Sequence, residues 1–422
     1  SADINSEWRE FLSAQARTFS REIGELKGSL MKAGQLLSIY GEHFLPPEIN
    51  ESLKSLQQDS PPLKWEAMEP ILRQNLSDEL LRELDIDPEP VGTASLGQVH
   101  RALIKTTGEQ IALKIQYPGV DKAIDSDLRA LRALLNVGKI LPKEFNPDPI
   151  FAEIRKMLVQ ETDYELEAQL TNEYRKKLEN DKRFIVPKVY PRYSGKKILA
   201  TSFEPGLRLD DGLVSSLQEG RRNRLATHFL DLYFTELFSW KFVQTDPHAG
   251  NYRVRLEPDG NDRIVLLDFG AACHYPDSFM NPFLRMIKAT WEKNHTQFLR
   301  AAQELKFLRK NDDPRLIQLF SEFCQLSFEP FLKPDDPRNN PPRVDPEGKY
   351  DWKNTDLPQR STSKAIQIAR SFSLRTPPQE IIFLNRKAGG TFVILSILGA
   401  HFNGHQLLKS YLDKISYKAK NP

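Results

Sequence analysis

The chain is poor in cysteine and in net charge, and both shortages exclude classes of protein. Its 422 residues contain only two cysteines, Cys273 and Cys324, which supply no disulfide framework and fit a reducing compartment. Their spacing is not that of metal ligands, so we expect both to be small buried hydrophobic residues. The formal net charge is +2. A near-neutral balance gives no long-range field for nucleic acid, and we expect no nucleic-acid partner.

Long hydrophobic runs are also missing. The longest apolar stretch, residues 391–400, is too short to span a bilayer and predicts a core helix. The first twenty residues are charged and amphipathic, which predicts no signal peptide. We therefore expect a cytoplasmic protein that would meet a membrane only peripherally, at its surface.

The pattern of apolar residues predicts an all-α extension over residues 1–86, followed by a lobe that contains strands. In the first helix, apolar residues recur at steps of four and three. A proline-rich and acidic stretch, residues 85–90, is expected to be a linker. The helices of the extension are expected at residues 6–39, 48–58 and 65–84.

The next segment, residues 87–203, combines strand and helix patterns. Strands alternate with small-residue turns, and Glu204-Pro205-Gly206 breaks the last strand where a hinge between lobes would lie. Residues 204–422 are mainly helical, with an irregular, proline-rich surface insertion expected at 329–358. The fold class is therefore α+β, with two lobes. Within 87–203, we expect a strand, a small-residue turn and a second strand over 92–102, then a turn at 107–109. Further strands are expected at 110–115 and 197–203, and helices at 120–135 and 149–178.

Three polar residues around a short strand form the most informative pattern. Asp246 is followed five residues later by Asn251, and Asp268-Phe269-Gly270 follows the apolar strand 264–267. Either half alone is a weak signal, but together they are typical of the metal-nucleotide site of kinases. In that interpretation Asn251 and Asp268 hold Mg²⁺, and Asp246 orients or deprotonates an acceptor.

A lysine and a small-residue turn precede these residues in the order found in kinases. Lys114 lies in mid-strand between apolar residues, where it is expected to bind the α- and β-phosphates of a nucleotide and to need a helix glutamate to hold it. The sequence leaves Glu153, Glu165 and Glu167 as candidates, with Glu167 a modest favourite. Small side chains between residues 92 and 97 would let backbone N–H groups approach phosphates; the candidates are Gly92, Thr93, Ala94 and Ser95.

The chain also departs from ordinary protein kinases. Thr245 stands where those enzymes usually have the arginine that receives an activation-loop phosphate. After Gly270 the sequence runs straight into a helical pattern, without an Ala-Pro-Glu motif or the length of a peptide-docking segment. Protein substrates are therefore not expected. His248, inside the catalytic loop, is expected to shape that loop through a hydrogen bond.

In four sequence motifs the chain closely resembles the UbiB family of atypical kinases, which is also called the AarF or ADCK family. Lys32-Ala33-Gly34-Gln35 resembles the KxGQ signature, and residues 92–100 resemble the nucleotide loop, with glycine and threonine where the family usually has alanine. Glu161-Thr162-Asp163 resembles ExD. The catalytic and metal motifs above complete the set, in family order.

The resemblance implies a kinase-like fold whose KxGQ helix crosses the site where a peptide would dock. It implies that Lys32 and Gln35 face the carboxylates of Glu161 and Asp163 near the nucleotide, and it assigns Glu167 as the partner of Lys114. It further implies ATP and Mg²⁺ as cofactors and a role in isoprenoid-quinone lipid metabolism. The expected partners are an adenine nucleotide, a lipid or quinone precursor, a membrane surface and quinone-biosynthesis proteins.

Two alternatives remain open from the sequence. Asp246, His248 and Asn251 also match the catalytic loop of small-molecule phosphotransferases such as aminoglycoside and choline kinases, although those enzymes lack a KxGQ helix. The other alternative is a nucleotide-gated, lipid-binding scaffold with little turnover.

Overall fold

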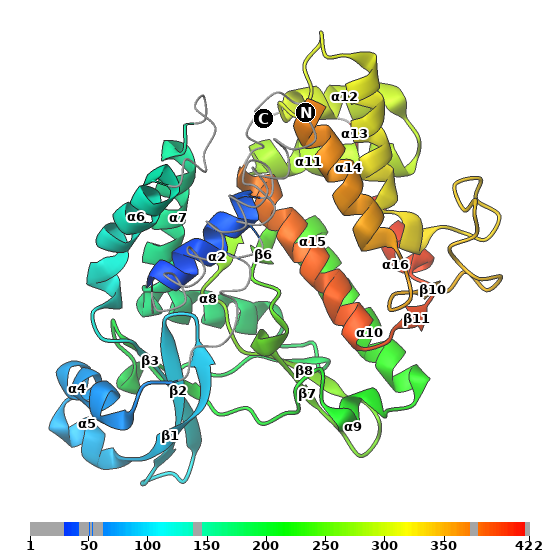
Figure 1. Ribbon diagram of the computed structural model, residues 1–422. Coiled ribbons are helices and arrows are strands. Elements are labelled where there is room, and N and C mark those ends of the chain that lie inside the picture. The colour runs from blue at the N-terminus through cyan, green and yellow to red at the C-terminus, as the bar shows by residue number, and fades with distance from the viewer. Residues whose placement is uncertain are drawn as a thin grey trace, which may run out of the picture. The chain divides into compact units, whose positions relative to one another are not determined.

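The computed structural model describes residues 29–41, 50, 53, 62–137, 146–371 and 379–417 (Figure 1). Of the helix expected at residues 6–39, only the part from Ser29 lies within this description, and most of the helix expected at 48–58 lies outside it. The chain forms two compact units. The sheet unit comprises the described residues of Ser1–Asn180, Val186–Glu204 and Asp268–Ala271. The helical unit comprises those of Asp181–Ile185, Pro205–Leu267 and Ala272–Pro422.

A four-stranded antiparallel sheet organises the sheet unit, with strand order β1-β2-β3-β5. Apolar residues alternate along β2 and β3, and the buried face joins the apolar side of α4 in one core. The turns expected around residues 95 and 108 are present. The bounds are α4 Trp65–Asn75, α5 Asp78–Glu83, β1 Leu84–Ala94, β2 Gly97–Ile104, β3 Gln110–Gln116 and β5 Ile198–Ser202.

The linker expected at residues 85–90 is wrong, because these residues belong to β1. β1 is an edge strand, and its pairing with β2 is shifted between Ile86 and Pro90 and again between Pro90 and Gly92. An edge strand with bulges tolerates proline, since the missing N–H need not join a ladder. The acidic, proline-containing sequence therefore forms a strand despite its composition.

Four helices complete the sheet unit, and α2 packs on α6 and α7 (Figure 1). The single helix expected at residues 149–178 is two helices. The break falls at Thr162 and Asp163, where Asp163 caps the second helix by accepting a hydrogen bond from the backbone N–H of Leu166. The bounds are α2 Ser29–Gly41, α6 Val120–Val137, α7 Asp148–Glu161 and α8 Tyr164–Lys177.

In the helical unit, α10 continues into a π-helical segment and then into short strands. β7 and β8 form an antiparallel hairpin with β4 parallel to β8, and β6 pairs with β9. The π-helical segment is Thr235–Trp240. The other bounds are β4 Phe184–Ile185, α9 Gly212–Ser215, α10 Glu219–Phe234, β6 Phe242–Gln244, β7 Tyr252–Arg255, β8 Arg263–Leu266 and β9 Ala272–His274.

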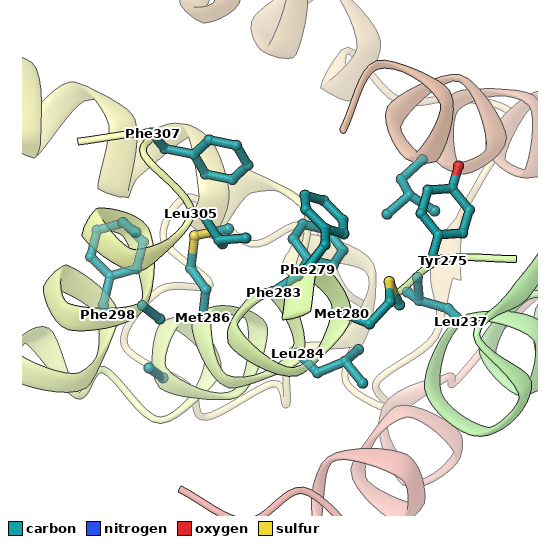
Figure 2. Close-up of a cluster of buried hydrophobic side chains, with 14 of the residues drawn as sticks. Leu237, Tyr275, Phe279, Met280, Phe283, Leu284, Met286, Phe298, Leu305 and Phe307 are labelled. Atoms are coloured by element: carbon teal, nitrogen blue, oxygen red, sulfur yellow. The ribbon is translucent and has the colours of Figure 1, made fainter. Parts of the chain in front are cut away.

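Aromatic and aliphatic side chains from α11, α12 and neighbouring segments form the main core of the helical unit (Figure 2). Phe279 and Phe283 stack with ring centroids 5.5 Å apart. Both cysteines are half-buried, and both pack against this core. The bounds are α11 Asp277–Trp291, α12 His295–Glu304, α13 Pro314–Leu326, α14 Leu357–Ser371, α15 Gln379–Ile397 and α16 His405–Leu412.

The segment 329–358 is irregular, as expected, but it is not merely a surface insertion. Phe331, Tyr350 and Trp352 are buried, and β10, Tyr350–Asp351, pairs with β11, His401–Phe402. The prolines set the irregular path, while the aromatic residues anchor it through their large apolar area. Among the helices of the described residues, none is long and apolar enough to cross a membrane.

Candidate active site

Lys114 is the centre of a charged cluster in the sheet unit. Its Nζ donates to Glu167 Oε1 at 2.7 Å and Oε2 at 2.9 Å, and to Asp268 Oδ2 at 3.0 Å. β3 supplies the lysine and the first turn of α8 supplies Glu167. The structure thus joins Lys114 to Glu167, while Glu165 is exposed and Glu153 lies on α7.

Two carboxylates share this one ammonium, and that imbalance sets the electrostatics of the cluster. Burial alone would lower the pKa of Lys114, but Asp268 and Glu167 outweigh burial and hold that pKa well above its ordinary value. Burial raises the pKa of Glu167 to about 7, with Lys114 opposing the rise and Asp268 adding to it. The lysine therefore stays charged at neutral pH and can attract a phosphate.

The junction between α7 and α8 positions the acidic residues. Glu161 is the last residue of α7, and Asp163 is the cap of α8. The carbonyl oxygen of Thr162, between them, accepts a hydrogen bond from Nε2 of the buried Gln116 at 2.9 Å. The bend of the chain is therefore fixed to the end of β3, close to Lys114 along that strand.

The segment Asp268-Phe269-Gly270 is attached to the same two helices. Phe269 packs on Tyr174 of α8 with ring centroids 4.7 Å apart, and Gln160 of α7 donates to the Gly270 carbonyl oxygen at 3.0 Å. Gly270 N–H donates to Asp268 Oδ1 at 3.0 Å. These contacts hold the Asp268 carboxylate beside Lys114.

Lys32, on α2, reaches the acidic junction and the small-residue turn together. Its Nζ lies 3.0 Å from Glu161 Oε1 and donates to Ser95 Oγ at 2.9 Å. Both charged side chains are largely buried, at 5% and 12% exposure. Asp163 is exposed and forms the α8 cap instead of an ion pair with Lys32. Gln35 lies one turn further along α2 and is half-buried.

The small-residue loop is tighter than expected. Gly92, Thr93 and Ala94 are paired with β2 as part of β1, and only Ser95 and Leu96 form the turn. Leu96 accepts a hydrogen bond from the backbone N–H of Tyr117 at 2.9 Å, just beyond the end of β3. The turn is thus held next to the strand that carries Lys114.

The catalytic loop lies in the helical unit between β6 and β7. The backbone carbonyl of Asp246 accepts hydrogen bonds from the side-chain amides of Gln244 at 2.8 Å and Asn251 at 3.0 Å. His248 Nδ1 accepts from the Gly250 N–H at 3.1 Å. His248 therefore has the loop-shaping contact that the sequence suggested.

Sequence reasoning missed two charged residues of α15, of which Arg386 contacts this loop. Arg386 Nη2 donates to Asp246 Oδ1 at 2.6 Å, and Lys387 forms an ion pair with Glu236 at 2.8 Å with side-chain exposures of only 5% and 1%. A methyl group at Gly390 would lie 2.0 Å from Cγ of Pro247, so the helix approaches the loop closely there.

The two expected metal ligands belong to different units, Asn251 to the helical unit and Asp268 to the sheet unit. Asn251 directly precedes β7, and its carbonyl oxygen accepts a hydrogen bond from the N–H of Leu267 at 2.9 Å. Asp268 is the next residue. Because the Asn251 amide nitrogen is engaged with Asp246, its side-chain oxygen is the atom offered to a ligand. Carboxylate and amide oxygens suit Mg²⁺, so the residues present fit this ion.

The paired lysine and glutamate and the aspartate after a strand define a kinase-like α+β protein. A family model described as the ABC1 atypical kinase-like domain matches residues 55–302, more than half of the chain. The chain therefore belongs to the ABC1 (UbiB) family of atypical kinases. A domain of this family implies binding of ATP.

Individual relatives cover nearly all of the chain. It is 29% identical to the mitochondrial atypical kinase COQ8B of Danio rerio over 92% of this chain and 60% of the relative. It is likewise 29% identical to the mitochondrial atypical kinase coq-8 of Caenorhabditis elegans, over 92% of this chain and 50% of the relative. The chain thus spans about half to three-fifths of their length. The structure of Rv3197 from Mycobacterium tuberculosis, a complex with erythromycin, matches with TM-score 0.60 and 26% identity over 98% of both chains.

Proposed function

We propose that the protein is an ATP-binding atypical kinase or ATPase of the UbiB type that supports isoprenoid-quinone lipid biosynthesis. The observation that carries the proposal is the Lys114 cluster. A lysine that stays protonated is fixed by buried Glu167 and lies 3.0 Å from the Asp268 carboxylate. Kinases use these three groups to bind and orient the phosphates of ATP.

Each residue has a distinct task in this proposal. Lys114 binds the α- and β-phosphates, and Glu167 keeps the ammonium in place. Asn251 and Asp268 hold Mg²⁺, which when bound neutralises negative charge on the phosphates. Asp246 orients or deprotonates an acceptor hydroxyl or water molecule. Arg386 positions Asp246, because its guanidinium binds that carboxylate directly.

In this proposal the phosphoryl acceptor is not an ordinary peptide. The α2 helix, held by Lys32 to Glu161 and Ser95, restrains the site against protein phosphorylation. The phosphoryl acceptor is then water, or a lipid or quinone precursor that the protein meets at a membrane surface. The family is the support for this part of the proposal.

Radiolabelled ATP tests the proposal with the purified full chain. The protein is incubated with Mg²⁺, with and without anionic vesicles and a phenolic quinone precursor, and released phosphate and labelled products are separated. We expect ATP to be consumed and consumption to be lost in Asp268→Asn. No consumption under any of these conditions, or an unchanged rate in the variant, would remove the catalytic part of the proposal.

A small-molecule phosphotransferase is the second candidate. The observation in its favour is that the similar M. tuberculosis structure contains erythromycin, a hydroxyl-rich small molecule. Mass spectrometry of erythromycin and a set of amino-sugar and choline acceptors after incubation with ATP separates the candidates. A stoichiometric phosphorylated product would favour this second function.

A further inference from the structure

Tyr164 lies against Lys114 and has a buried polar atom. It is the first residue of α8, directly after the capping Asp163, and its side chain is 1% exposed. Within the described part of the chain, its hydroxyl has no hydrogen-bond partner. Buried tyrosine hydroxyls usually have a hydrogen-bond partner, because a buried donor without one is costly.

The ring of Tyr164 is held on two sides. Its apolar surroundings are Val189, Leu199 and Ala168, and these alone would be satisfied by phenylalanine. Toward the cluster, Lys114 Nζ lies 5.2 Å from the ring centroid, in the range of a cation–π contact. The ring therefore packs as a hydrophobic residue, with the ammonium of Lys114 over it.

The hydroxyl extends under the small-residue turn. A methyl group at Gly97, the first residue of β2, would lie 2.7 Å from the Tyr164 hydroxyl oxygen and 2.3 Å from the carbonyl oxygen of Ile115. A residue without a side chain is needed there for the tyrosine to reach this position. The hydroxyl thus lies beside the residue that follows the turn, on the strand that pairs with the lysine-bearing β3.

The charge around Tyr164 leaves its proton in place. Burial raises the pKa of the hydroxyl, with Lys114 opposing and the neighbouring carboxylates adding to the rise. At neutral pH the group is a neutral phenol and hence a hydrogen-bond donor. The carboxylates nearby would repel an anion, so a donor beside Lys114 adds to the attraction for a phosphate.

We propose that the Tyr164 hydroxyl donates a hydrogen bond to a phosphate oxygen of the nucleoside di- or triphosphate bound by Lys114. This inference rests on the proposed function, since it assigns a further binding residue to the same site. It explains why tyrosine stands where phenylalanine would pack equally well.

Tyr164→Phe tests the inference because it keeps the ring and removes only the hydroxyl. Calorimetric titrations of the full chain with adenosine, ADP and ATP in Mg²⁺ give the affinities, and thermal unfolding without ligand gives the stability. We expect ADP and ATP to bind about tenfold more weakly or worse, adenosine to bind equally, and the unliganded variant to melt at the same temperature or higher. Tyr275→Phe, a buried tyrosine of the helical unit, is the matched control and should change no affinity.

Three outcomes would overturn the inference. Unchanged affinity for ADP and ATP would leave the proposed function standing and show that the hydroxyl does not bind phosphate. An equal loss for adenosine, ADP and ATP would show that it shapes the site as a whole. If the wild-type chain binds no nucleotide, the inference and the proposed function fall together.

Discussion

Arg386 binds Asp246 through an ion pair of 2.6 Å, although the two residues are 140 positions apart in the chain. Arg386 comes from α15 and Asp246 from the loop after β6. Thr245 occupies the place where protein kinases carry an arginine next to the catalytic aspartate. Here the guanidinium reaches that aspartate from a distant helix, so the C-terminal part of the helical unit is part of the proposed catalytic machinery.

The first prediction is that Arg386→Ala lowers ATP turnover about tenfold or more and leaves nucleotide affinity unchanged. The variant loses the guanidinium donor that orients the Asp246 carboxylate, while Lys114 and Glu167 are untouched. Arg386→Lys keeps the charge without the planar fork and should recover only part of the rate. Steady-state kinetics with ATP titrations measure both quantities.

Arg285→Ala is the control for this prediction, because it breaks another ion pair of the helical unit, with Glu304 at 2.6 Å, away from the catalytic loop. It should retain the wild-type rate. Wild-type turnover in Arg386→Ala would show that the pair with Asp246 has no part in catalysis.

The second prediction concerns the buried pair Lys387–Glu236. Burial disfavours the charged lysine, but Glu236 holds the pKa of Lys387 above its ordinary value. Lys387→Met leaves a buried carboxylate without its cation, and we expect the free energy of unfolding to fall by about 3–5 kcal/mol. Adding Glu236→Gln should recover much of that loss. Urea unfolding followed by circular dichroism measures these changes.

An exposed pair provides the comparison. Lys409 and Asp413 form an ion pair with exposures of 47% and 61%, so Lys409→Met should change stability by less than about 1 kcal/mol. Equal effects of the two lysine substitutions would contradict the buried character of Lys387.

The third prediction is that Lys32→Met raises transfer of phosphate to the protein itself. The substitution removes the ion pair to Glu161 and the hydrogen bond to Ser95, which hold α2 to the sheet unit. Incorporation of label from radiolabelled ATP is measured on the intact chain. Lys122→Met, on an exposed lysine of α6, serves as control. If Lys32→Met folds and incorporates no more label than wild type, α2 does not restrain the site.

The fourth prediction concerns pH. The pKa of Glu167 is raised by burial from 4.5 to about 7, so the folded chain holds this proton more tightly than the unfolded chain. The stability that the protonated carboxyl contributes is complete below about pH 4.5 and is lost as pH rises through about 7. Glu167→Gln cannot lose that proton. Relative to this variant, wild type should lose up to about 3 kcal/mol of unfolding free energy between those pH values, at about 1.4 kcal/mol per pKa unit.

Urea unfolding of both proteins at a series of pH values without nucleotide measures this difference. If the unfolding free energies of wild type and Glu167→Gln change with pH in parallel, burial does not raise the pKa of the Glu167 carboxyl.

Local patterns were enough to predict four of the strands in the described residues. β2, β3, β5 and β8 follow alternating or continuous apolar residues bounded by turns. β1 was missed because its acidic and proline-containing sequence is typical of a linker, and only its place at the sheet edge makes it a strand. The break between α7 and α8 was missed because the apolar pattern continues through Asp163, whose capping hydrogen bond decides it.

The candidate site was predictable where residues act through motifs. Lys114, Asp246, Asn251 and Asp268 could be named from spacing, whereas the choice of Glu167 needed the family resemblance. Arg386 and Lys387 could not be paired from the sequence, because their partners lie far away along the chain and no short-range pattern encodes such a contact.

Calorimetric titration of Mg-ATP into wild type, Lys114→Met and Lys197→Met tests the central claim most directly. Lys197 forms an ion pair with Asp121 on the same unit, at 3.0 Å, and is a matched control. The account predicts saturable binding to wild type and Lys197→Met, and binding at least about tenfold weaker to Lys114→Met. Equal binding to all three proteins, or no binding to wild type, would contradict the assignment of the Lys114 cluster as the phosphate site.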